Sequence, residues 1–190
     1  MYLLEYCREL RYIATIMKRS DIHPLPEYFD RYINLVPDVE LVKAFDDSLR
    51  QIDSLDRPTL TSLAGKRYAA DKWTVNDTIQ HLIDTERIMS YRTLLYARRD
   101  GTVPAGFDQD YLVAHAGADR RPIGKLLDEL TALRRATKSM FESFDDETLR
   151  CRGICWKYEI SVLAMGFSTI GHQFHHLKIV EEKYYPLLRS

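Results

Sequence analysis

The sequence predicts an all-α protein, a four-helix bundle with a long crossover loop between its second and third helices. Apolar residues recur at the three-and-four spacing of an amphipathic helix over four segments, 38–55, 74–99, 122–144 and 161–185. Runs with the alternation of a β-strand are almost absent. One long connection in the middle of four helices is typical of bundles with a crossover.

The first two predicted helices are defined by an apolar side and by a capping signal. The apolar side of the first consists of Val39, Val42, Phe45, Leu49 and Ile52. The second opens at Thr74 with Asp77 three residues later, a pair that resembles a capping box. It ends at Asp100 and Gly101, because glycine is unfavourable inside a helix.

The second half of the chain contains the crossover and the last two helices. Residues 100–121 combine glycine, alanine and polar residues and are expected to form the loop. The third helix starts at Pro122, since proline suits a first-turn position. Its buried stripe consists of Ile123, Leu126, Leu127, Leu130, Leu133, Met140 and Phe144. Pro186 closes the fourth helix.

The segments before the bundle are predicted to be an appendage and a connector. Residues 3–17 have helical spacing, so 1–20 are expected to form an N-terminal helical appendage. Residues 21–37 contain three prolines and should be an extended connector, which leaves 38–190 as the bundle. Charged residues interrupt the apolar stretch at the N-terminus, so we do not expect a signal peptide.

The composition of the chain limits the kinds of partner that we expect it to bind. The 190 residues include 27 Lys+Arg and 28 Asp+Glu, a formal net charge of −1, so a nucleic-acid partner is not expected. No apolar run approaches the roughly 20 residues of a membrane span. Three scattered cysteines, Cys7, Cys151 and Cys155, suit neither a disulfide framework nor a zinc ribbon. We therefore expect a reduced, cytoplasmic setting.

Two histidines of the fourth helix form the clearest candidate site. At about 100° per residue, His172 and His176 lie about 40° apart, both within the apolar sector. His175 points about 60° away from His172 on the other side, toward the charged face, and is not expected to be a ligand. Two imidazoles one turn apart on a buried face suit a divalent metal, although Zn²⁺, Ni²⁺ and Fe²⁺ all accept them.

Polar residues also point inward on the second helix. His81, Thr85 and Arg92 fall within about 40° of one another on its apolar side. Buried polar groups are costly unless paired or ligated, so this strip is a candidate site. For Arg92 two interpretations remain open: an anion-binding group for substrate, or a buried ion pair with Asp84, Glu86 or an acid of another helix. The spacing of residues within each helix cannot show whether His81 lies near His172 and His176.

Three motifs resemble the DinB-like family. They are KWTVNDTIQHLIDTERIMSYR (72–92), GFDQDY (106–111) and GHQFHHLKIVEEKY (171–184), and the resemblance covers roughly residues 25–188. It implies a four-helix bundle in which His81, His172 and His176 hold a divalent metal. Members include DNA-damage-inducible proteins and proteins described as metal-dependent hydrolases, and the wider superfamily includes bacillithiol transferases and mycothiol-dependent isomerases. The sequence leaves open whether the protein forms a homodimer.

The chemistry of such a metal leaves three functions open. A metal with three protein ligands can lower the pKa of a bound water and act in hydrolysis. It can instead ionise a thiol, which would make the partner a low-molecular-weight thiol and the protein a transferase. In the third hypothesis, the protein is linked to stress and binds the metal without catalysing a reaction. Asp108 and Asp110 are candidate bases or helix caps, and Trp73 and Tyr111 are candidate pocket or core residues.

Overall fold

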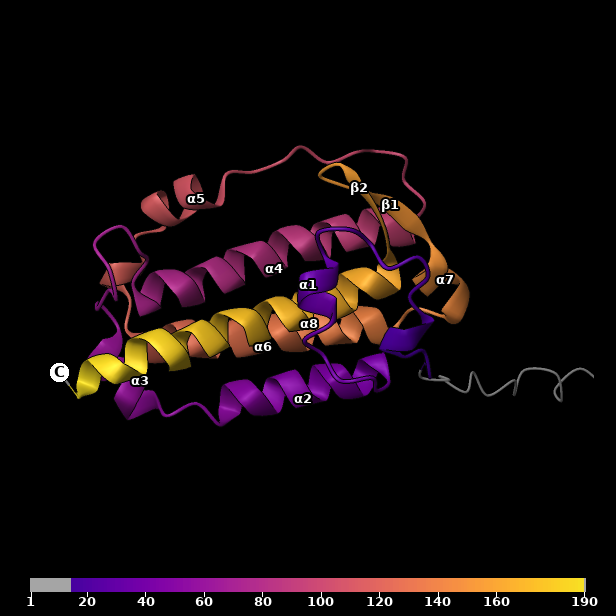
Figure 1. The fold of residues 1–190 in the computed structure, drawn as a ribbon. Coiled ribbons are helices and arrows are strands. Elements are labelled where there is room, and N and C mark those ends of the chain that lie inside the picture. Colours follow the sequence, from indigo (N-terminus) through magenta and orange to yellow (C-terminus); the bar gives the residue numbers. More distant parts are fainter. Residues whose placement is uncertain (1–14, 190) are drawn as a thin grey trace, which may run out of the picture.

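The computed structural model describes residues 15–189, and four long helices form its bundle. They are α2 (Leu41–Asp53), α4 (Val75–Ala97), α6 (Ile123–Glu142) and α8 (Val162–Ile179). Figure 1 shows them lying side by side along one direction. The predicted four-helix bundle is confirmed, and the first three helices begin and end close to their predicted bounds. Helix α8 ends at Ile179, short of the predicted 185, and a π-helical turn, η3 (Val180–Tyr184), follows it. The helix predicted over 3–17 falls, except for its last three residues, outside the described part.

The order of the helices around the bundle explains the crossover. Helix α4 packs against α6 and α8, and α2 packs against the same two, so α2 and α4 stand diagonally. Figure 1 shows that α4 and α6 run in the same direction. Neighbouring parallel helices need a connection that returns along the whole bundle, and residues 98–122 make it.

The crossover was expected to be a loop, and that expectation is wrong for its second half. Helix α5 (Gln109–Ala116) and the 3₁₀ turn η2 (Ala118–Arg120) lie within it. The carboxylate of Asp108 accepts hydrogen bonds from the backbone N–H groups of Asp110 and Tyr111, which caps α5. Gly117, with φ of 61°, ends it in a left-handed turn. Short helices of this kind carry too weak an apolar pattern to be detected.

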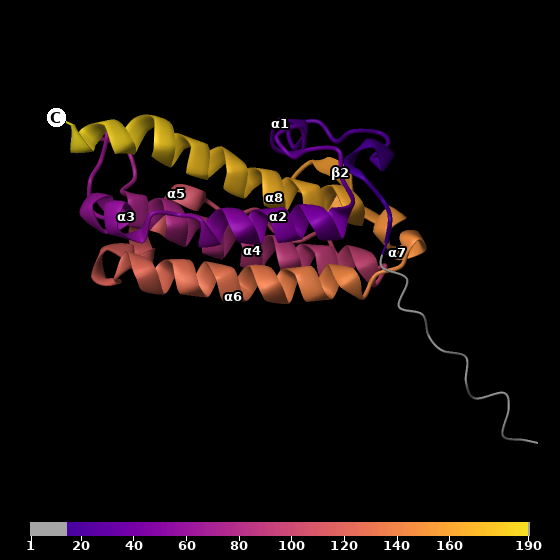
Figure 2. The same ribbon diagram turned by 90° about the horizontal axis from the view of Figure 1, so that it is seen from below.

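The segment predicted as a connector is packed into the core. It begins at the last residue of the turn η1 (Arg19–Asp21) and contains helix α1 (Asp30–Ile33), and α1 packs against α8, as Figure 2 also shows. Its buried side chains include Ile22, Phe29, Ile33 and Val36. The prolines suppress regular helix over most of this stretch, while its apolar residues still cover the bundle.

A β-hairpin, which the sequence pattern did not reveal, covers one end of α4. Strand β1 (Arg152–Cys155) pairs antiparallel with β2 (Tyr158–Ser161). Gly153 lies so close to Tyr96 that an added Cβ would stand 2.0 Å from its ring. The Tyr96 hydroxyl donates to the Ile154 carbonyl oxygen over 2.7 Å. These contacts fix Cys155 above α4.

Short elements complete the described chain. They are α3 (Arg57–Leu63), α7 (Asp146–Arg150), the π-helical turn η3 (Val180–Tyr184) and the 3₁₀ turn η4 (Tyr185–Leu188). None of the helices described has the length and apolar character that crossing a membrane requires.

A buried polar network links all four long helices. Arg134 of α6 is 1% exposed and forms an ion pair with Glu86 of α4, which is 2% exposed. Its Nη1 donates to Ser48 Oγ of α2 over 2.8 Å. The side-chain amide of Gln173 on α8 donates to the Ser48 carbonyl oxygen over 3.0 Å. Because Gln173 follows His172 directly, this network holds the helix positions next to the candidate site.

Candidate metal centre

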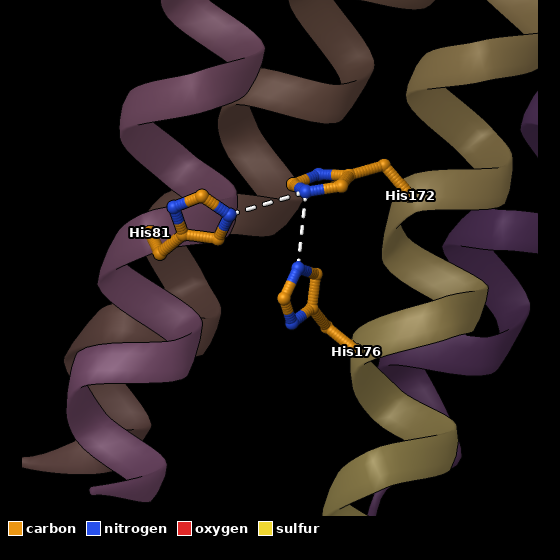
Figure 3. A group of neighbouring side chains, drawn as sticks. All are labelled: His81, His172 and His176. Atoms are coloured by element: carbon orange, nitrogen blue, oxygen red, sulfur yellow. Dashed lines mark hydrogen bonds between the residues drawn. The ribbon is translucent and has the colours of Figure 1, made fainter. Parts of the chain in front are cut away.

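His81, His172 and His176 converge between α4 and α8, the two helices that carry them (Figure 3). The Nε2 atom of His172 lies 3.1 Å from His81 Nε2 and 3.0 Å from His176 Nε2. One candidate ligand atom of each ring lies within 4.8 Å of the other two. The fold therefore places α4 next to α8, which the spacing of the histidines in the sequence could not establish.

The three rings fit a divalent metal. Nitrogens bound at about 2.0–2.1 Å in tetrahedral geometry, or at neighbouring octahedral positions, are separated by roughly 2.8–3.4 Å. The separations of His172 Nε2 from His81 Nε2 and from His176 Nε2, 3.1 and 3.0 Å, fall within that interval. Hydrogen bonding alone serves the three atoms poorly, because His172 Nε2 has either one lone pair or one proton for two neighbouring nitrogens. A metal would accept all three lone pairs.

The rings are in the form that binds metal. Burial lowers the pKa of His81 to about 4 and that of His176 to about 3. Burial, with the neighbouring imidazoles, holds the pKa of His172 well below its usual range. All three are therefore neutral near pH 7, and neutral imidazole is the metal ligand. His172 and His176 are partly exposed, so the centre is reachable from solvent.

Neighbouring side chains fix the orientation of the rings. The Oγ1 of Thr85 lies 3.4 Å from Nδ1 of His81, which leaves Nε2 facing the other histidines. Trp73 packs on His81 with ring centroids 4.7 Å apart, and the Tyr32 ring meets His172 edge-on at 5.1 Å. Trp73 is half-buried and belongs to neither buried core cluster, and it lines a separate pocket together with Asp110, so the predicted core role is not what the structure shows.

Tyr32 was missed by the sequence reasoning, although a signal exists. It sits on α1, and an added Cβ at Gly171 would stand 2.0 Å from its carbonyl oxygen. Only a glycine at this position lets α1 approach α8 closely enough to place the ring on His172. The glycine directly before the first histidine of the motif was the available clue.

A cavity opens beside the histidines. Its lining includes His81 and His172, the ion pair of Glu86 and Arg134, and Phe107 and Gln109 from the crossover. Glu86 is not free to act as a base there, because Arg134 Nε and Nη2 occupy both of its carboxylate oxygens at 2.8–3.1 Å. The crossover therefore covers the candidate centre without sealing it.

His175 lies outside the histidine group, as its helical angle predicted. Its ring meets those of Tyr32 and His176 at centroid distances of 5.5 and 5.1 Å, and it is partly exposed. Tyr111 is 62% exposed and stacks on His115, so it does not line the cavity beside the histidines.

Arg92 lies in an adjoining cavity and has no acidic partner among residues 15–189. The predicted alternative of an ion pair with Asp84 or Glu86 is wrong: Glu86 pairs with Arg134, and Asp84 accepts from Gln80. Arg92 instead donates to the Ala105 carbonyl oxygen over 2.7 Å and to Cys155 Sγ over 3.2 Å. Asp108 is engaged as a helix cap, and Asp110 lines neither of these two cavities.

Fold and site together define a four-helix-bundle protein with a candidate three-histidine metal centre. A model of the DinB superfamily matches residues 40–180, and the chain belongs to that superfamily. The fold is similar to a solved structure described as "YfiT from Bacillus subtilis is a probable metal-dependent hydrolase with an unusual four-helix bundle topology". The two are 17% identical over 85% of this chain and 89% of that one, with a TM-score of 0.63. No match was found among curated proteins.

Proposed function

We propose that the protein is a metal-dependent hydrolase that holds one divalent metal ion through His81, His172 and His176. The observation that supports this most is the convergence of three neutral imidazoles beside an open cavity. Three protein ligands leave coordination positions for a substrate or water, unlike a closed structural zinc site. The membership of the DinB superfamily and the YfiT-like fold agree with this proposal.

The bound metal would supply Lewis-acid chemistry and a water of lowered pKa. The chain's own residues prepare the site for it. Thr85 and Trp73 hold His81 with its Nε2 turned toward the partner rings. Phe107 and Gln109 of the crossover line the cavity, and the proposed substrate is a small molecule. Arg92, farther along α4, is proposed to bind an anionic part of that substrate.

The proposed setting is the cytoplasm, in keeping with the unpaired thiols of Cys151 and Cys155. The identity of the metal is left to experiment, since Zn²⁺, Ni²⁺ and Fe²⁺ share the same ligand preference here.

The test is reconstitution after chelation. Stripped protein would receive Zn²⁺, Ni²⁺ or Fe²⁺ singly and be assayed for hydrolysis of carboxylic ester and amide panels, with His172→Ala as the inactive control and His175→Ala as the matched active one. Metal-dependent hydrolysis that only His172→Ala abolishes would support the proposal. Thiol-transfer activity without hydrolysis would favour the transferase reading, and metal binding without either activity would favour a non-catalytic role.

A further inference from the structure

A second cavity, of about 240 Å³, continues from the one beside the histidines. The two share five lining residues: Tyr28, Phe29, Met89, Phe107 and Gln109. At its far end the second cavity is lined by Arg92, Cys155 and Trp156. One cleft therefore leads from the candidate metal centre to a buried guanidinium.

The positive charge of Arg92 is not compensated by the described chain. The residue is 3% exposed, and no carboxylate of residues 15–189 lies within ion-pair distance of it. Its Nη1 and Nη2 donate to neutral partners, and its buried Nε has no hydrogen-bond partner. An isolated buried charge is strongly unfavourable, so such a group calls for a counter-anion.

The neighbouring titratable groups do not supply that anion. Burial raises the pKa of the Cys155 thiol, and it raises the pKa of Tyr96 to about 12, so both are neutral near pH 7. Arg134 provides the comparison within the same chain. It is similarly buried on the neighbouring helix, yet each of its three nitrogens donates to the Glu86 carboxylate or to the Ser48 hydroxyl. Both arginines line a cavity, but only Arg134 has a carboxylate partner there.

We propose that this second cavity is an anion subsite, and that it binds a carboxylate attached to an apolar or aromatic body. Among residues 15–189, Arg92 is the single cation that lines it, which suits a monoanion better than a phosphate dianion. The rings of Phe29, Phe107 and Trp156 line the remainder and match an apolar body. The Arg92 guanidinium already lies 5.5 Å from the Phe107 ring centroid.

The subsite also constrains the substrate of the proposed hydrolase, and this part alone rests on the proposed function. Arg92 follows His81 by eleven residues, about 16 Å along the helix at 1.5 Å per residue. A substrate that reaches both ends would carry its carboxylate at one end and its reacting bond at the other. The expected class is therefore extended, singly anionic molecules with an apolar middle.

The experiment measures binding to metal-stripped, full-length protein by titration calorimetry. The probes are 3-phenylpropionate and its neutral amide, which differ in charge and little in shape. The carboxylate should bind with one site per chain, and the amide should bind roughly 10–100-fold more weakly, as expected for the loss of a charge-assisted hydrogen bond. Arg92→Met should weaken carboxylate binding by a similar factor and remove the difference between the probes.

Two control variants separate this subsite from the metal. Arg57→Met removes an exposed arginine of α3 and should leave carboxylate binding unchanged. His172→Ala should also leave it unchanged while abolishing metal-dependent activity, so either proposal can fail without the other. Equal binding of the two probes to the native protein, or binding of neither at millimolar concentration, would overturn the anion subsite. This comparison on the native chain holds even if Arg92→Met does not fold.

Discussion

Replacing Arg134 with methionine should lower the free energy of unfolding by about 3–5 kcal/mol, the usual cost of breaking a buried ion pair. The substitution leaves the Glu86 carboxylate, 2% exposed, without its cation. It also removes the donor to Ser48 Oγ. For a chain of this size the melting temperature should fall by roughly 6–20 °C. Methionine keeps most of the side-chain volume, so the loss measures the interaction more than a cavity.

The assay is urea unfolding followed by circular dichroism, with two comparisons. Asp128→Asn breaks the exposed pair of Arg57 and Asp128 and should cost at most about 1 kcal/mol. The double variant Glu86→Leu/Arg134→Met removes both charges and should recover much of the loss, since an apolar replacement of a buried pair is often neutral.

A loss below about 1 kcal/mol for Arg134→Met would refute the structural role assigned to the pair. So would a double variant that is less stable than the native protein by the sum of the losses of Glu86→Leu and Arg134→Met, because the two charges would then act independently. In that case Glu86, which lines the cavity beside His81, would have to be reconsidered as a group of the site.

The remaining predictions concern pH, packing and a cap. Because burial lowers the pKa of His81 from 6.5 to about 4, the unfolded chain binds more protons between these values. Metal-free protein should thus lose about 2 kcal/mol of stability from this group between pH 7 and 5, and His81→Asn should show a flatter pH profile. Gly171→Ala should lower the free energy of unfolding by about 1–3 kcal/mol, because the added Cβ would be pushed against Tyr32. The control Gly124→Ala should not destabilise the protein, because the nearest neighbour of its added Cβ lies at 3.8 Å. Thermal melts compare the two variants. Asp108→Asn preserves the cap and should keep both stability and activity, whereas loss of a general base would lower the rate about 10²–10⁴-fold.

Most of the fold could be predicted from the periodic spacing of apolar residues and from helix-capping residues. The stripe beginning at Ile123 and the capping box of Thr74 and Asp77 both identify helices whose ends the structure confirms. The hairpin escaped because its turn, Trp156-Lys157, lacks the usual Asn-Gly signal, although Trp156 does adopt a φ of 60°. Its strands are four residues each, too short for a clear alternation.

The site was predictable only in part, for a physical reason. Helical angles placed His172 and His176 on one face and excluded His175, because these positions share one helix. Contacts between elements, such as Tyr32 on His172 and Cys155 on Arg92, depend on how short segments cross the bundle. Gly171 signals that some backbone approaches α8 closely, but no local pattern shows which residue does so, and neither contact could be derived from the sequence alone.

The most direct test of the proposed centre is metal content measured by plasma mass spectrometry after exposure to Zn²⁺, Ni²⁺ or Fe²⁺ and desalting. The native protein and His175→Ala should each retain one ion per chain. His81→Ala and His172→Ala should retain almost none while keeping the native circular dichroism spectrum. Equal metal loss in His175→Ala, or a native protein that retains none of the three metals, would contradict the assignment of His81, His172 and His176 as the metal ligands.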